Sequence, residues 1–240
     1  YRKADGSLIT PYQIYGRAKG YPELFYCEGS TISLKGSTTR KIAFERTSKQ
    51  HVRISQNTVK DSVLVEKMLM NKQNFKSAKD VDGFVPQASG LYCIRIKNVH
   101  LLPEPFGTIL LERGHDILYI GIASENLYNR FLNQELRAKG HGTFFRSMGA
   151  VLGYKPPKGS LIEKRNKKNY KFSKTDELKI IGWINENLMV NWVESAGDLD
   201  SLETSLIVKY LPLLNLSKNP AALQILSYLR KECVEIANRN

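Results

Sequence analysis

The spacing of hydrophobic residues divides the chain into a part that predicts short strands and a part in which strands alternate with helices. In the first 56 residues, apolar side chains recur at every second position, which is the period of a half-buried strand. These alternating runs lie at 32–34, 42–44 and 52–54. Residues 57–75 carry apolar side chains three and four positions apart, which predicts a helix.

The hydrophobic pattern is interrupted near residue 85. Gly83, Pro86 and Gly90 fall within ten residues there, and these residue types break regular structure. We place a domain boundary at this point. Residues 1–85 form an N-terminal region of strands plus one helix, and residues 86–240 form a second domain.

The second domain mixes strands with helices, which predicts an α+β fold. The expected strands are 91–97, 115–123 and 189–195. The expected helices are 124–140, 143–153, 175–188, 198–211 and 219–239. Ser124 and Thr175 are candidate N-caps, because a hydroxyl before an apolar stripe can accept a hydrogen bond from the first turn. The segment between the first two strands is typical of a long loop.

The positive net charge of the chain indicates the kind of molecule that it binds. Lys and Arg number 36 against 23 Asp and Glu, and the isoelectric point is about 9.6. A protein this basic usually binds a polyanion, and nucleic acid is the first candidate. The alternative is a solubilising surface charge. The expected phosphate contacts lie in the N-terminal strands and in a basic loop at 155–174: Arg40, Lys41, Arg53, Lys164, Arg165, Lys167 and Lys168.

Two features exclude other classes of protein. No apolar run approaches the about 18 residues of a membrane span, so no membrane partner is expected. Cys27, Cys93 and Cys233 are odd in number and widely spaced. That spacing fits neither a disulfide framework nor a metal cluster, so we expect a reducing compartment and three buried, apolar cysteines.

Five positions in the second domain form a specific pattern. Gly90-Leu91-Tyr92 begins the first strand, and Tyr119-Ile120-Gly121 lies in the second. Arg130 follows on the next helix. Glu203 and Asn215 stand twelve residues apart in the sequence ETSLIVKYLPLLN. Each residue alone has an ordinary explanation, as a half-buried strand aromatic, a surface charge or a turn residue.

Together these motifs resemble the GIY-YIG nuclease family over residues 90–240. The segments 141–153, 175–188 and 212–230 are similar to a bacterial branch of that family, in which the loop between the two strand motifs is longer. The resemblance implies a small three-stranded antiparallel sheet flanked by helices, preceded here by the basic strand and helix region.

The resemblance also implies roles for the matched residues. Tyr92 would accept a proton from the attacking water or orient that water, and Tyr119 would support it. A tyrosine pKa of about 10 is too high for a base at neutral pH, so we expect nearby cations to lower it. Arg130 would supply such a charge and bind phosphate oxygens. Gly121 would let the backbone pass close to the substrate.

The metal and the second base complete this set of implied roles. Glu203 would bind one Mg²⁺, or Mn²⁺ in its place, and Asn215 would hold the site together by hydrogen bonds. Many family members carry a His or Tyr four residues after the arginine, but this chain has Gln134. His141 is a candidate substitute, and Arg146 on the following helix is a candidate phosphate contact.

The expected function is therefore a metal-dependent endonuclease that hydrolyses phosphodiester bonds of double-stranded DNA in a bacterial cytoplasm, associated with the nucleoid when bound. A sequence-specific enzyme of restriction or phage defence is the first expectation, and cutting both strands would favour a homodimer. The alternatives are a structure-specific repair nuclease, a mobile-element nuclease, and a DNA-binding module of the same fold that does not cut. Gln134 is the sequence feature that favours the last.

Overall fold

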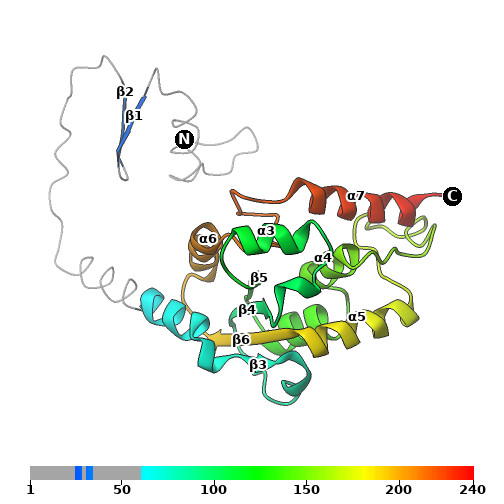
Figure 1. Ribbon diagram of the computed structural model, residues 1–240, viewed down its shortest axis with the longest axis horizontal. Coiled ribbons are helices and arrows are strands. Elements are labelled where there is room, and N and C mark those ends of the chain that lie inside the picture. The colour runs from blue at the N-terminus through cyan, green and yellow to red at the C-terminus, as the bar shows by residue number, and fades with distance from the viewer. Residues whose placement is uncertain (1–24, 29–30, 35–60) are drawn as a thin grey trace. The chain divides into compact units, whose positions relative to one another are not determined.

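The computed structural model describes residues 25–28, 31–34 and 61–240, and the chain divides into two units, 1–49 and 50–240 (Figure 1). The first unit contains an antiparallel hairpin of β1 (Phe25–Glu28) and β2 (Thr31–Leu34). β2 covers the first of the three alternating runs. The other two runs, together with Arg40, Lys41 and Arg53, lie outside the described residues.

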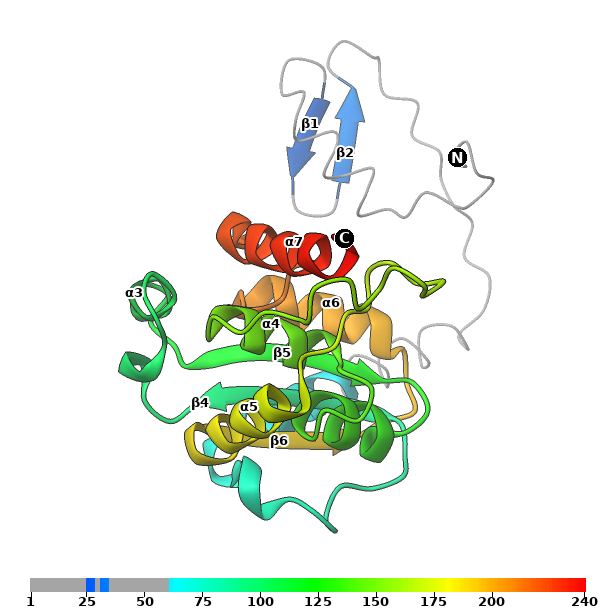
Figure 2. The same ribbon diagram turned by 90° about the vertical axis from the view of Figure 1, so that its right-hand side faces the viewer.

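The second unit is built on a four-stranded antiparallel sheet rather than the expected three strands. Its order is β3 (Lys76–Ser77), β6 (Leu188–Glu194), β4 (Gly90–Ile96) and β5 (Ile117–Ala123). The three long strands match the sequence prediction and lie side by side (Figure 2). The fourth was missed because β3 has only two residues, too few for an alternating pattern.

Helices surround this sheet, and they confirm an α+β fold. They are 61–70, α3 (Phe106–Glu112), the π-helix η4 (Tyr128–Leu136), α4 (Thr143–Val151), α5 (Lys174–Asn187), α6 (Leu199–Tyr210) and α7 (Gln224–Asn238). Short 3₁₀ turns occur at η1 (Lys72–Asn74), η2 (Ala78–Asp80) and η3 (Val99–Leu101). Across the described residues no helix is both long and apolar enough to cross a bilayer.

The helix starts differ from the expected caps. Ser173 rather than Thr175 caps α5, where its hydroxyl accepts a hydrogen bond from the Asp176 N–H at 3.1 Å. Asn126 rather than Ser124 bonds the start of the helix that carries Arg130, accepting from the Asn129 N–H at 3.1 Å. A capping side chain is recognised by hydrogen-bond reach, and several neighbouring polar residues satisfy the same sequence rule.

The expected loop at 98–114 contains a helix, α3, whose last turn leads to Arg113. The Arg113 guanidinium donates hydrogen bonds to the carbonyl oxygens of Leu211 and Ala221, both at 2.6 Å. These carbonyls belong to the segment between α6 and α7. Arg113 therefore fixes the segment that carries Asn215.

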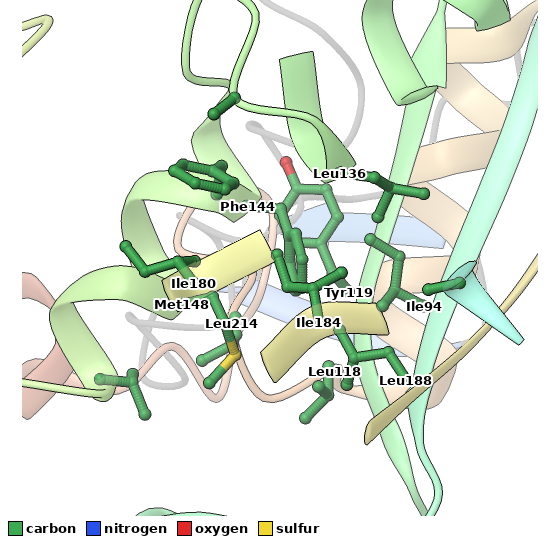
Figure 3. Packing of buried hydrophobic residues seen from close by; sticks show 14 of the residues in the cluster. Ile94, Leu118, Tyr119, Leu136, Phe144, Met148, Ile180, Ile184, Leu188 and Leu214 are labelled. Carbon is green, nitrogen blue, oxygen red and sulfur yellow. The ribbon is translucent and has the colours of Figure 1, made fainter. Parts of the chain in front are cut away.

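The central strand β4 is buried on both faces, so the sheet separates two hydrophobic cores. Leu91 and Cys93 face a core that includes residues of α6, whereas Tyr92 and Ile94 face the larger core beneath α4, α5 and α7. Successive residues of β4 thus face opposite cores, as expected for a strand buried on both sides. Figure 3 shows part of the larger core, where Tyr119 packs with Phe144, Met148, Leu214 and the α5 residues Ile180 and Ile184. Cys93 and Cys233 are buried and free, as expected.

A short segment after α6 runs along the outer edge of β5. The Leu213 and Leu214 N–H groups donate to the carbonyl oxygens of Ile117 and Leu118, at 3.2 and 2.8 Å. The Asn215 side chain accepts from the Ile120 N–H at 3.0 Å and donates to the Ile120 carbonyl at 2.8 Å. The edge strand is thus hydrogen-bonded on both of its sides.

Candidate active site

A polar pocket of about 520 Å³ lies where β4, β5, the π-helix η4 and α6 meet. Four of the residues matched by the sequence pattern line it: Tyr92, Tyr119, Arg130 and Glu203. The remaining lining residues are Ile122, Ser124, Glu125, Asn126, Asn129 and Gln134. Side chains from four elements, separated by more than 100 residues along the chain, thus converge on one cavity.

The two tyrosines share a face of the sheet because of strand register. Tyr92 pairs with Gly121, and Tyr119 stands two residues before Gly121 on β5. The rings stack with centroids 6.2 Å apart. A Cβ atom at position 121 would lie 2.5 Å from the hydroxyl oxygen of Tyr92, a distance too short for real atoms. The glycine is therefore required to make room for the tyrosine ring.

Arg130 reaches the tyrosines through a carboxylate that the sequence analysis missed. Its Nη1 lies 3.0 Å from Oε1 of Glu135, and the same nitrogen donates to Gln134 Oε1 at 3.0 Å. The Tyr92 hydroxyl donates to Glu135 Oε1 at 3.4 Å. One carboxylate oxygen is thus shared by the tyrosine and the arginine.

Glu135 is fully buried, and the fold provides a place for it. Its second oxygen, Oε2, accepts a hydrogen bond from the Phe145 N–H at 3.2 Å, in the first turn of α4. A Cβ atom at Gly142 would lie 1.9 Å from that oxygen, so the carboxylate occupies the space that a side chain would fill. One sequence signal was present: Leu127, Phe131 and Glu135 are spaced by four on the inward face of the helix.

The tyrosine hydroxyls are poor acids in this pocket. Burial raises the pKa of Tyr92 well above its ordinary value, and the Glu135 carboxylate raises it further. Burial raises the pKa of Tyr119 in the same way. Arg130 lowers both values, but its effect is smaller than that of burial. The result is the reverse of the sequence expectation that cations lower the tyrosine pKa.

Glu203 projects from α6 into the pocket, and its ion-pair partner among the described residues is Lys218. Lys218 Nζ lies 2.7 Å from Glu203 Oε2 and 2.5 Å from Asp200 Oδ1. Within the described part of the chain, no group of three His, Cys, Asp or Glu side chains converges on one point. Glu203 and Glu125 both line the pocket, and hard carboxylate oxygens of this kind suit Mg²⁺ or Mn²⁺.

Of the remaining predicted residues, Asn215, His141 and Arg146 lie outside the pocket. Asn215 is buried and bonds the backbone of β5, as described above. His141 faces Glu177 at 3.5 Å, and burial lowers its pKa to about 4, so it is a neutral residue away from the pocket lining. Gln134 does line the pocket. Arg146 is buried, and its guanidinium donates to the His141 carbonyl.

The basic loop is exposed at all four predicted lysine and arginine positions. It is anchored to the end of α7, because the Leu161 N–H donates to the Ala237 carbonyl at 2.7 Å. Lys167 differs from the other three, since its ammonium group donates to the carbonyl oxygens of Leu161 and Ile162. Of these four cations, Lys164, Arg165 and Lys168 are therefore the ones best placed to meet a ligand.

Comparison with known proteins identifies a protein family. The family model described as the GIY-YIG catalytic domain matches residues 90–232, which is more than half of the chain. No curated protein and no solved structure matches the chain.

Proposed function

The chain belongs to the GIY-YIG catalytic domain family, a family of DNA endonucleases, and from that premise we propose that it hydrolyses double-stranded DNA with a divalent metal ion held at Glu203. The observation that carries this proposal is the convergence of Tyr92, Tyr119, Arg130 and Glu203 on one polar pocket. Phosphodiester hydrolysis needs an activated water, a cation for the charge that develops on phosphate, and help for the leaving oxygen.

The roles follow from position and chemistry. Arg130 is one-third exposed toward the pocket, so part of its guanidinium is free to bind phosphate oxygens. The Tyr92 hydroxyl orients the attacking water. The Tyr119 ring, which stacks on the Tyr92 ring, limits the movement of Tyr92. Mg²⁺, or Mn²⁺, bound at Glu203 would supply Lewis-acid stabilisation of the phosphate. Lys218 holds Glu203 Oε2, which fixes the direction of the carboxylate toward the pocket.

The more specific parts of the proposed function rest on the sequence. We propose sequence-specific cutting, in restriction or phage defence, by an enzyme of the bacterial cytoplasm that acts as a homodimer to cut both strands. The division into an N-terminal specificity region, 1–85, and a catalytic region, 86–240, belongs to the same proposal. Repair of branched DNA and mobile-element cleavage are the competing roles. Binding without cutting is the competing activity, and Gln134 is the feature that favours it.

Incubation with supercoiled and branched DNA, with and without Mg²⁺, tests the proposed function. We expect nicked and linear products only with Mg²⁺ or Mn²⁺. A preference for one sequence supports restriction, and a preference for branched DNA supports repair. Tight binding without cleavage in either metal would instead identify a binding module.

Salt dependence tests the phosphate contacts of the basic loop. Replacing Lys164, Arg165 and Lys168 with alanine should reduce the slope of log Kd against log salt by about 2 to 3 units, because each phosphate contact releases close to one counterion. The matched control replaces Lys72, Lys76 and Lys79, three exposed lysines outside the loop. An equal slope for wild type and the loop variant would show that the loop only faces solvent.

A further inference from the structure

Glu135 is the buried charged group next to the candidate pocket for which neither the sequence pattern nor the proposed function has a role. It does not line the pocket, yet it contacts two groups that do, Tyr92 and Arg130. A fully buried carboxylate is costly unless it is paired. The fold nevertheless excludes a side chain at Gly142 and aims the Phe145 N–H at this carboxylate. These contacts accommodate the Glu135 carboxylate in the core, and we therefore look for a chemical role for it.

We propose that Glu135 is the proton acceptor behind Tyr92, and that the Tyr92 hydroxyl passes a proton from the attacking water to Glu135 Oε1. This inference rests on the proposed function, since it assumes that water attacks phosphate beside Tyr92. The geometry that supports it is the position of Tyr92, which lines the pocket and whose hydroxyl donates to Glu135 Oε1 at 3.4 Å. Catalytic hydrogen bonds in a ligand-free site are often long and shorten when substrate binds.

The relay solves a difficulty that the pocket creates for a tyrosine base. Forming a free phenolate at Tyr92 would place a negative charge in a buried site next to a carboxylate, which is why its pKa lies well above the ordinary value. In a relay, the phenol loses one proton as it gains another, so no phenolate accumulates. Tyr92 remains neutral before and after the step.

The proposed step is the attack of water on phosphorus with transfer of one proton through Tyr92. One water O–H bond breaks and its proton goes to the Tyr92 oxygen, while the Tyr92 proton goes to Glu135 Oε1. The water oxygen forms a bond to phosphorus, and the bond between phosphorus and the leaving oxygen breaks with its electron pair on that oxygen. The leaving oxygen takes a proton from solvent. Glu135 then returns its proton to solvent through Tyr92 after the product has left.

Arg130 gains a second role from the same contacts. In the resting site its charge is divided between Glu135, 3.0 Å away, and the pocket. When Glu135 accepts a proton, the carboxylate charge that holds Arg130 disappears. The guanidinium charge is then available to the phosphate at the moment when negative charge develops there. Proton transfer and charge stabilisation are thereby coupled through one carboxylate oxygen.

The groups that face Glu135 decide whether it can accept a proton. Burial raises the pKa of Glu135 above the ordinary value for a glutamate. Arg130, on the same helix, lowers this pKa, and so do the Phe144 and Phe145 N–H groups of α4. Arg146 lowers it by a smaller amount. Tyr92 faces it from β4. The net effect is a carboxylate that is a stronger base than a solvent-exposed one. Activity should be lost as pH falls through this raised pKa.

Glu135→Gln tests the relay, because glutamine keeps the size of the side chain but cannot accept the proton. We expect the single-turnover cleavage rate in Mg²⁺ to fall by about 10²-fold, with DNA affinity unchanged and with the acid limb of the pH profile abolished. The matched control is Glu177→Gln, which removes another buried, cation-paired glutamate outside the pocket. It should keep the wild-type rate and pH profile.

A double-mutant cycle with Tyr92→Phe separates a relay from a purely structural role. Two members of one relay act as a unit, so Tyr92→Phe, Glu135→Gln and the double variant should lose similar rates. Losses that multiply in the double variant overturn the relay. So does a Glu135→Gln rate within a few-fold of wild type. If wild type itself cuts no DNA in either metal, the proposed function has failed and not the relay alone.

A substitution at Tyr92 keeps the proposal testable if Glu135→Gln does not fold. Fluorinated tyrosine at position 92 lowers the pKa of the phenol while the ring is preserved. If Tyr92 acted as a free phenolate, the pH profile would move to lower pH with the phenol pKa. In the relay the acid limb belongs to Glu135, so it stays in place. A shift of the limb with the phenol pKa overturns the proposal.

Discussion

Glu203→Gln is expected to lower the rate of Mg²⁺-dependent DNA cleavage by about 10³-fold or more. Lewis-acid stabilisation of the transition state by a metal is worth several kcal/mol, and each ~1.4 kcal/mol changes the rate tenfold. The substitution keeps the shape of the side chain and removes its charge. DNA binding, measured by fluorescence anisotropy without divalent metal, should stay within a few-fold of wild type. Single-turnover rates over a range of Mg²⁺ and Mn²⁺ concentrations are the measurement.

Asp200→Asn is the matched control for this substitution. Asp200 and Glu203 both pair with Lys218, but only Glu203 lines the pocket. Removing the Asp200 charge should therefore leave cleavage near the wild-type rate. If both variants lose activity equally, the common cause is Lys218 and the metal assignment is wrong. If Glu203→Gln cuts at the wild-type rate, the metal is held elsewhere.

Arg130→Ala is expected to reduce the cleavage rate by about 10²–10³-fold, the usual cost of removing a charged group that stabilises the transition state. It should also destabilise the fold, since it leaves the buried Glu135 carboxylate without its ion-pair partner, at a cost of about 3–5 kcal/mol. Arg95→Ala is the matched control, because Arg95 is a buried arginine on the opposite face of β4, paired with Asp116. It should cost stability with little change in rate per folded molecule.

The stability loss of Arg130→Ala should depend on pH and should grow as pH rises. Burial raises the pKa of Glu135 in the folded chain, and removing Arg130 raises that pKa further. A carboxyl whose folded pKa lies above its unfolded pKa costs nothing below the unfolded value and progressively more as pH rises toward the folded value. Denaturant unfolding should therefore show a small deficit at acid pH and a larger one at neutral pH. A deficit independent of pH would mean that Arg130 does not interact with Glu135.

The sequence predicted the pocket better than it predicted the groups that support it. Tyr92, Tyr119, Arg130 and Glu203 were found because their order and spacing form a pattern, and the structure brings them together. The expected metal chemistry and base chemistry remain proposals. His141 was considered because of its residue type, but its place in the fold depends on Glu177 and the aromatic residues beside it, which no local pattern reveals.

Glu135 illustrates what sequence reasoning overlooks. A glutamate in a helical segment is normally exposed, so the ordinary expectation is a solvated side chain. Its burial depends on the Phe145 N–H that bonds its carboxylate and on the missing side chain at Gly142, which lie outside the sequence pattern of the helix. Both are tertiary effects. The strand β3 was missed for a related reason, since two residues pair with β6 only because the fold brings them there.

The segment that follows α6 has a consequence for assembly. Open strands at the edge of a sheet can recruit a strand from another molecule, which leads to continuous sheets between subunits or to aggregation. At β5 the outward backbone groups of Ile117, Leu118 and Ile120 are already satisfied by residues 213–215. A dimer that positions two pockets on the two strands of DNA would therefore have to associate through side-chain surfaces or helices, and not by extending the sheet at β5.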